Sequence, residues 1–402
     1  MSGFIHPSPL PRHDSPLDEP WFRCVAPVPS VSNLSASVAP GAPTVNSGAS
    51  TPSSKNEDGC RFTVTAFAGH EEEILRLRNA NRSNEQKSRA YLDWRYRVLD
   101  GAPQPCVFWV HSPDGVPIGM AALIFRRYWI DGRPGFVAVL GDISLDASLR
   151  GKGVGRELLR RVSDHLQHNI ADCLGLVIPT EAARKSLTAV GWKEAGTLRS
   201  FVFMVKPEQQ LRRVLPVNAI AAPLGWLYRK CVFMLLRWHI EAGRSLQLVA
   251  EPGADVDALS QRVATPGSIV RDRGREALTW RYTEHPNHRF QFAKLVQNPD
   301  LVLGYAVFRL TEEGKTCEIY DLIVPQEDLA CMLALLVTHC ESLGNVTTIR
   351  LLLNHQHRYR SGLWKLCFMP REIHGVFQVY GPARSSAPSA SAWAISAGDK
   401  DI

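Results

Sequence analysis

The chain has 402 residues, 45% of them hydrophobic, and its 46 basic and 39 acidic side chains give a formal net charge of +7 at pH 7. This length exceeds the usual size of one domain and predicts two. No basic run is interleaved with aromatic residues, so we expect no nucleic-acid partner. Nine cysteines without paired spacing argue against zinc and disulfides, so we expect no metal, reduced thiols and a cytoplasmic protein.

Both ends of the chain are rich in Pro, Ser, Ala and Gly. Segments of this composition cannot bury enough apolar surface to offset the entropy of ordering. Residues 1–59 are therefore predicted to be a disordered arm, and residues 383–402 a disordered tail. The N-terminus shows no basic patch followed by an apolar core, so we expect no targeting signal.

A predicted strand, a glycine-rich turn and a predicted helix follow one another between residues 136 and 166. The strand, at 136–145, is rich in β-branched and apolar side chains, and the helix, at 154–166, carries its apolar residues along one face. The first turn of a helix has unpaired N–H groups and the positive end of the helix dipole. The turn therefore predicts a site for a phosphate-bearing ligand.

The turn reads Arg150-Gly151-Lys152-Gly153-Val154-Gly155-Arg156, which fits neither the P-loop nor the Gly-x-Gly-x-x-Gly spacing of dinucleotide-binding folds. It resembles the coenzyme A loop of the GNAT superfamily of N-acetyltransferases. That loop has Arg or Gln, two further residues, Gly, one residue, and then Gly or Ala. Arg150, Gly153 and Gly155 match each required position.

Three further features stand in the order that the family shows: a predicted strand at 173–178, a short predicted helix at 182–190, and Gly191-Trp192. The resemblance implies an α/β (α+β) domain, with a mixed, mostly antiparallel sheet flanked by helices and a splayed parallel strand pair at the CoA site. We assign this acyl-CoA-binding domain to residues 60–206. The implied cofactor-binding residues are Ser144, Leu145, Arg150, Gly151, Lys152, Gly153, Val154, Gly155 and Arg156.

Acyl transfer to an amine needs a group that accepts the amine proton and a donor for the developing oxyanion. The resemblance implies that the donor is a backbone N–H close to Ser144 or Leu145. Asp142 is the first candidate base, because a carboxylate in an apolar strand should have a raised pKa; a structural ion pair with an arginine is an equal alternative. Glu181 is a weaker candidate base, or else a solvated first-turn residue of its helix.

Two positions depart from the family pattern. The family often has a tyrosine acid where this chain has Leu187, and an asparagine where it has Thr180. These departures argue against a tyrosine acid but leave the cofactor loop intact.

Residues 207–245 are predicted to be an apolar linker. Pro223, Gly225 and three basic residues interrupt its most apolar part, residues 219–239, so no continuous membrane span is expected. A helix is predicted at 224–238. We favour an interdomain helix packed in the core over an interfacial helix that would give peripheral membrane contact through residues 219–239.

Short motifs recur in a fixed order along the chain. Trp94-Arg95-Tyr96 returns as Trp280-Arg281-Tyr282, and Gly141-Asp142-Ile143 is echoed by Tyr320-Asp321-Leu322. This order indicates a duplicated domain, with the second copy at residues 246–382. We favour the interpretation of the repeated Trp and Tyr as packing anchors over the alternative that Arg95 or Tyr96 lines the acceptor site.

The second copy differs where the cofactor loop should be. It has no glycine turn, and it places Glu327 and Asp328 near the helix start that would face a pyrophosphate. It is therefore predicted to be a degenerate GNAT-like domain that shapes the acceptor cleft.

The sequence thus predicts an acyl-CoA-dependent N-acyltransferase, with acetyl-CoA or another acyl-CoA as donor. A small-molecule or polymer amine, bound near the domain interface, would attack the thioester directly. Two alternatives stay open: a non-catalytic acyl-CoA-binding or regulatory module, and a membrane-surface envelope or polysaccharide acyltransferase. The sequence leaves the oligomeric state open.

Overall fold

The computed structural model describes residues 59–81, 86–99, 101–170, 173–208, 218–298, 301–381 and 389–400. The strands are β1 (Arg61–Ala66), β2 (Cys106–His111), β3 (Pro117–Ile130), β4 (Arg133–Leu145), β5 (Leu174–Val177), β6 (Lys193–Met204), β7 (Arg244–Val249), β8 (Ile269–Arg271), β9 (Gln291–Gln297), β10 (Leu301–Thr311), β11 (Thr316–Ile323), β12 (Thr348–Asn354) and β13 (Met369–Tyr380). The α-helices are α1 (Glu71–Ala80), α2 (Arg89–Arg95), α3 (Val154–Asn169), α4 (Glu181–Ala189), α6 (Asn218–Arg237), α7 (Asp255–Val263), α8 (Arg275–Leu278), α9 (Leu329–Ser342) and α10 (Arg360–Lys365).

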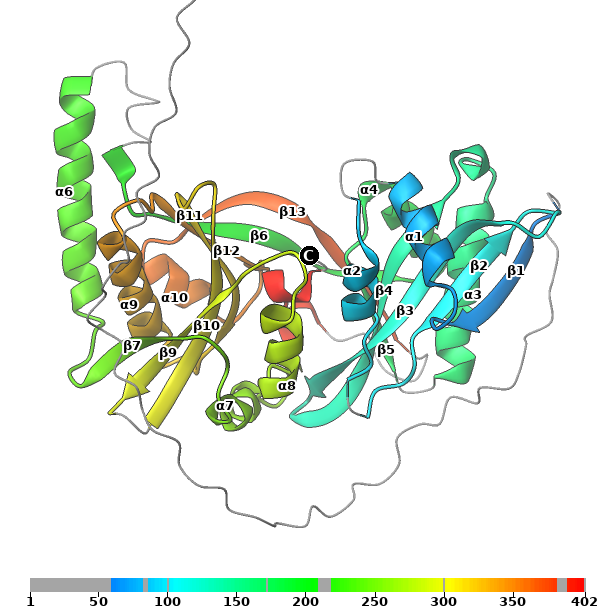
Figure 1. Cartoon of the computed structure of the whole chain (residues 1–402). Helices are drawn as coiled ribbons and strands as arrows, with labels where there is room; N and C mark the ends of the chain where they lie inside the picture. Colours follow the sequence, from blue (N-terminus) through cyan, green and yellow to red (C-terminus); the bar gives the residue numbers. More distant parts are fainter. Residues whose placement is uncertain are drawn as a thin grey trace, which may run out of the picture. The chain divides into compact units, whose positions relative to one another are not determined.

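The described strands join in one continuous sheet, shown in Figure 1. Its order is β1-β2-β3-β4-β5-β13-β6-β12-β11-β10-β9-β7, and β8 pairs with β3 outside this path. Neighbours are antiparallel except for two parallel pairs, β4 with β5 and β11 with β12. Each half of the chain therefore repeats one pattern, a run of antiparallel strands that ends in a parallel pair. The predicted fold class and the duplicated organisation are confirmed.

The two halves exchange their last strands. β13, late in the chain, pairs with β5 of the first half, and β6, from the first half, pairs with β12 of the second. β13 and β6 also pair with each other and so join the halves, as Figure 1 shows. The domain boundaries at 60–206 and 246–382 follow the repeat along the chain but not the grouping of strands in space. The alternation of apolar residues predicts which residues form a strand. It does not predict which strand lies beside it, because pairing with either candidate buries the same apolar face.

Helices cover both faces of the first half of the sheet. On one face, α3 buries Val154, Leu158 and Val162 against the sheet, together with Trp192. On the other face, α1 and α2 contribute Ile74 and Trp94 to a separate core cluster. The apolar period predicted for the helix after the glycine turn therefore corresponds to its packed face.

The end of the chain is ordered, in contrast to the disordered tail predicted at 383–402. Trp393 and Ile395 are fully buried, and Ser396 caps a short 3-10 turn at Ala397–Asp399. The backbone N–H of Ala394 donates to Ile269 at 3.0 Å, and that of Asn354 donates to Ile395 at 2.9 Å. The average composition of the segment did not indicate that two of its large apolar residues, Trp393 and Ile395, pack in the core. Apart from Gly59, the predicted arm at 1–59 lies outside the described residues, as do 383–388 and 401–402.

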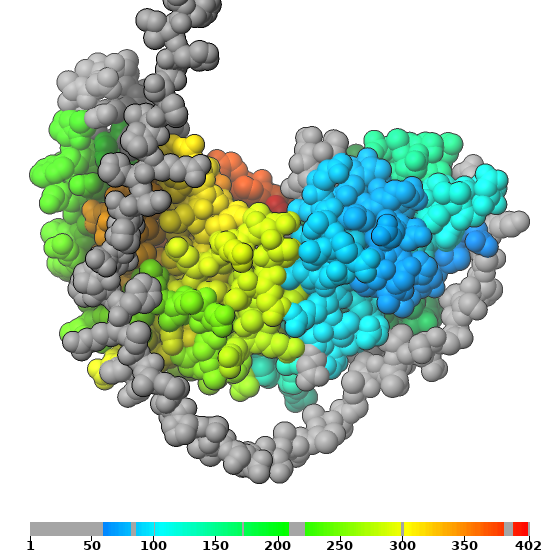
Figure 2. Space-filling view, in the orientation of Figure 1, coloured from blue at the N-terminus to red at the C-terminus, as the bar shows by residue number. Residues whose placement is uncertain are grey.

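The linker helix is also placed differently from the favoured prediction of a helix buried in the core. Only one side of α6 packs on the second half, through Val232 and Leu236, whereas Trp226 is 55% and Trp238 81% exposed. Its residues, green at the left of Figure 2, lie at the surface. Within the described ranges, no helix combines the length and apolar character needed to cross a membrane.

Candidate functional site

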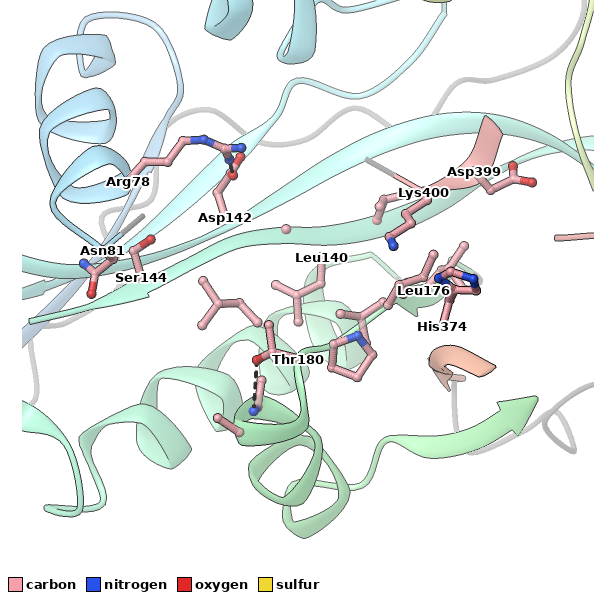
Figure 3. Close-up of a pocket in the computed structure, with 18 of the residues that line it drawn as sticks. Arg78, Asn81, Leu140, Asp142, Ser144, Leu176, Thr180, His374, Asp399 and Lys400 are labelled. Carbon is pink, nitrogen blue, oxygen red and sulfur yellow. Dashed lines mark hydrogen bonds and ion pairs between the residues drawn. The ribbon is translucent and has the colours of Figure 1, made fainter. Parts of the chain in front are cut away.

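A cavity of about 1470 Å³ extends from the glycine turn to residues of the second half. Strands β4 and β5, the turn after β4 and the start of α4 form one part of its lining, and residues of β10–β13 form another. Figure 3 shows Asn81 and Ser144 toward one end and His374, Lys400 and Asp399 toward the other. The cavity thus joins the predicted cofactor loop to a surface supplied by the second half.

The parallel strands β4 and β5 separate inside this cavity. Their pairing runs only from Val137–Leu174 to Val139–Leu176, although β4 continues to Leu145. Beyond that point, residues 140–145 and 176–180 line the cavity. The splayed parallel pair that the resemblance implied is therefore present, and the opened part of β4 leads to the glycine turn.

The glycine turn has the backbone geometry that its residues suggest. Gly151 and Gly153 both have φ +79°, a region that side-chain-bearing residues rarely adopt, and a Cβ on either would meet no described atom within 4 Å. Gly153 stands at the N-cap of α3, so the first N–H groups of that helix open onto the turn. A Cβ on Gly155 would lie 2.8 Å from Leu145 Cδ1, so that glycine allows close packing.

The structure brings most of the predicted cofactor residues together. Ser144, Leu145, Arg150, Gly151, Gly153, Gly155 and Arg156 line the cavity. Val154, the first residue of α3, is instead fully buried in the core, and Lys152 is exposed. The two departures from the family pattern are also placed: Thr180 lines the cavity and caps α4 by accepting from Ala183 N–H, and Leu187 is buried.

Asp142 lies at the cavity but is surrounded by donors. Its carboxylate is ion-paired with Arg78, accepts from Arg95 Nε at 2.6 Å, and accepts from the Tyr96 hydroxyl at 2.9 Å. The residue is 5% exposed and has φ +49°. Of the two interpretations given to Asp142, this geometry favours the structural ion pair.

The corresponding residue of the second half makes the same type of contact. Asp321 accepts from Arg273 Nε at 2.7 Å and from the hydroxyl of Tyr282, the tyrosine of the repeated tripeptide. Burial alone would raise the pKa of Asp321, but the charge of Arg273 and the Tyr282 hydroxyl hold it below its usual value. A strand aspartate that fixes the tripeptide tyrosine is thus common to both halves.

Glu181 lies outside the described lining of the cavity. Its side chain is 77% exposed and ion-pairs with Arg184 at 3.3 Å, one helical turn away. The geometry favours a solvated first-turn residue of α4, which was the alternative to a base.

Sequence reasoning missed a histidine–serine pair in the cavity. His374 on β13 is hydrogen-bonded to the buried hydroxyl of Ser200 on β6, and both residues line the cavity. Burial and the charges of Lys400 and Arg350 lower the pKa of His374 below 6.5. No local motif marks this pair, because only the exchange of β6 and β13 brings it to the site.

The second half adds a positively charged surface to the cavity. Glu318 accepts from Arg350 at 3.1 Å and lies 3.7 Å from Arg309, so two guanidinium groups share one carboxylate. Arg78 and Arg95 share Asp142 in the same way. Basic lining residues therefore outnumber the acidic ones, and Lys400 adds a further positive charge.

In the second half, residues around Ser396 occupy the position that corresponds to the separated strands of the first half. The pairing of β11 with β12 ends at Ile319–Leu351. Ser396 forms a bridge with Leu353, and its hydroxyl donates to Asp321 at 2.8 Å. At the start of α9, the Asp328 carboxylate accepts from Arg244 at 2.7 Å. Groups of the chain itself thus fill the region that corresponds to the opened strand pair of the first half.

Comparison with known proteins finds a family match within the first half. Residues 72–189 match the acetyltransferase (GNAT) family. A search of curated proteins finds no match.

Three solved structures resemble the chain. A GCN5-related N-acetyltransferase from Anabaena variabilis is 12% identical, with a TM-score of 0.56 over 79% of this chain and 72% of that one. A probable N-acyltransferase from Enterococcus faecalis is 11% identical, with a TM-score of 0.57 over 80% and 72%. A tandem GNAT protein from the clavulanic acid biosynthesis pathway is 14% identical, with a TM-score of 0.50 over 81% and 100%. These similarities establish the fold, including its tandem arrangement.

Proposed function

We propose that the chain is an acyltransferase that transfers the acetyl group of acetyl-CoA to an amine bound between its two halves, and the match of residues 72–189 to the acetyltransferase (GNAT) family supports this. The observation that carries the proposal is the continuous cavity, which has the glycine turn at one end and His374 and Lys400 toward the other. A donor held by the turn would extend along the splayed strands toward the second half.

The turn would bind the pyrophosphate of the donor. Gly151 and Gly153 leave the N–H groups at the start of α3 open to an anion, and Arg150 and Arg156 add positive charge. The pantetheine arm of the donor would then pass between β4 and β5. A backbone N–H near Ser144 or Leu145 would stabilise the oxyanion that forms when the amine attacks the thioester carbonyl.

We assign the proton acceptor to His374 rather than to Asp142 or Glu181. A base must be free to take a proton, but Asp142 accepts from two arginines and a tyrosine, and Glu181 lies outside the described cavity lining. The lowered pKa keeps the His374 imidazole neutral near pH 7, as a general base requires. The Ser200 hydroxyl would hold the ring in place.

The charge of the lining supports an acceptor that carries an acidic group beside its amine. Glu318 faces the two guanidinium groups of Arg309 and Arg350, which leaves a net positive charge beside it. A carboxylate or phosphate on the acceptor would neutralise this charge. We therefore propose an anionic amine, such as an amino acid or a phosphorylated amine, as the acceptor class.

Thermal stabilisation by acetyl-CoA, together with release of free thiol in the presence of amines, tests the proposal. Gly153→Trp should abolish both, because the ring would fill the space open to the phosphates. Glu327→Trp is the matched control: it places the same ring beside the exposed start of α9 and should change neither. Stabilisation that survives Gly153→Trp would contradict the loop assignment. Stabilisation without thiol release from any amine would indicate a non-catalytic acyl-CoA-binding module instead.

A further inference from the structure

Helix α6 presents an exposed apolar face that the proposed function does not use. The opposite face is fixed to the second half: Val232 and Leu236 are buried in its core, and Tyr228 and Phe233 pack against the same cluster. The helix is therefore held in place by its inner side. Its outer side is exposed although the helix is packed against the second half.

The outer residues form one stripe along α6. An α-helix turns about 100° per residue, so positions three, four, seven and eleven apart lie on one face. The exposed apolar residues follow this spacing: Leu224, Leu227, Cys231, Met234, Leu235 and Trp238. Leu224, Leu227, Met234 and Leu235 are each 48–57% exposed, and Trp238 is 81% exposed. We call these six residues the α6 stripe.

Basic and aromatic groups border the α6 stripe. On the helical projection, Lys230 and Arg237 lie on one edge, next to Trp226, whose ring the Lys230 ammonium approaches to 5.8 Å. Residues 209–240 of the sequence include no Asp or Glu. An apolar stripe with a basic border, and tryptophan near both ends, has the composition of a helix at a membrane interface.

We propose that α6 docks the protein on the surface of a membrane that contains anionic lipids. The α6 stripe would enter the boundary between headgroups and acyl chains, with Lys230 and Arg237 at the lipid phosphates. The helix would lie along the surface, since no described helix is long and apolar enough to cross a bilayer. The charge pattern favours lipid over a second copy of the chain, because a symmetric dimer through this face would bring like charges together without acidic partners.

Flotation of the full chain with lipid vesicles tests this proposal. The native protein should float with vesicles of phosphatidylcholine and phosphatidylglycerol, and much less with phosphatidylcholine alone. Leu227→Glu combined with Met234→Glu should abolish flotation. Val116→Glu, which changes a similarly exposed apolar residue in the β2–β3 turn, should leave flotation unchanged.

Charge variants separate the electrostatic contribution from the apolar one. Lys230→Gln and Arg237→Gln should each lower partitioning to the anionic vesicles by about fivefold, and added salt should have a similar effect. Circular dichroism and the midpoint of thermal unfolding check that each variant is folded.

Any of three outcomes would overturn the proposal. The first is that the native chain fails to float, and the second is that the Leu227→Glu/Met234→Glu variant floats as well as the native protein. The third is that sedimentation shows a native dimer that this variant converts to a monomer. The last result would assign the α6 stripe to contact between copies of the chain. None of these outcomes bears on acyl transfer, so the two proposals stand or fall separately.

Discussion

The indole N–H of Trp94 donates to the main-chain oxygen of Trp280 at 2.7 Å, and the indole N–H of Trp280 donates to the main-chain oxygen of Trp94 at the same distance. The two rings stack with their centroids 5.4 Å apart. Such reciprocity requires that the two halves be related by an approximate two-fold axis between these residues. The repeated tripeptide therefore joins the halves, which confirms its interpretation as a packing anchor.

Replacing either tryptophan should destabilise the fold. Trp94→Phe or Trp280→Phe removes one buried indole hydrogen bond and part of the ring packing, so each should lower the free energy of unfolding by about 1–3 kcal/mol. Because the rings also touch, the double variant should lose less than the sum of the single losses. Urea denaturation measures this coupling. Trp238→Phe, at an exposed site, is the control and should change stability by less than about 0.5 kcal/mol. Strict additivity would contradict the reciprocal pair.

The proposed role of His374 predicts a pH dependence. A general base must be deprotonated, so kcat/KM should rise with pH through the pKa of His374, which lies below 6.5. His374→Gln should remove this acidic limb and lower kcat by about 10²- to 10⁴-fold. His168→Gln, at an exposed histidine of α3, should keep the limb. A limb that persists in His374→Gln would assign the base elsewhere.

We expect Asp142 to stabilise the fold rather than to accept the proton of the amine. Asp142→Ala leaves the buried guanidinium groups of Arg78 and Arg95 without their carboxylate, which should cost about 3–5 kcal/mol in chemical denaturation. The shape of the pH profile should stay unchanged in the fraction that folds. If the variant instead loses the acidic limb while keeping native stability, Asp142 is the base after all.

The positive lining predicts a preference among acceptors. Arg350→Gln removes one of the two cations at Glu318 and should raise KM for acceptors that carry a carboxylate or phosphate, with little change for simple alkylamines. Steady-state kinetics over matched pairs of amines measures the difference. An equal change for both kinds of amine would contradict an anionic acceptor.

The order at the end of the chain can be tested through one side chain. Trp393 is fully buried, so Trp393→Ala should lower the free energy of unfolding by about 3–5 kcal/mol. Ser391→Ala, two residues away at an exposed position, should have almost no effect. A tail that is disordered, as its composition predicts, would make the two variants equivalent.

The sequence predicted those features that adjacent residues encode. The glycine turn and its flanking strand and helix depend on local pattern and spacing, the splayed strand pair was implied by the resemblance to the GNAT superfamily, and all are present. The position of His374 could not be predicted in this way, because its place in the cavity depends on which strand β13 pairs with. Asp142 shows a similar limit: its position at the cavity was predicted, but its two arginine partners come from helices far away along the chain. The buried Trp393 was missed because composition averages over a segment.

The exchange of β6 and β13 makes each half incomplete by itself. In this structure β5 takes its partner β13 from the second half, and β6 of the first half pairs with β12 of the second. The His374 side of the cavity also comes from the second half. The arrangement is that of a strand-swapped dimer whose two subunits are joined in one chain. Because the halves are parts of one chain, a substitution in one leaves the other unchanged, so the first can carry the glycine turn while the second supplies the opposite wall of the cavity.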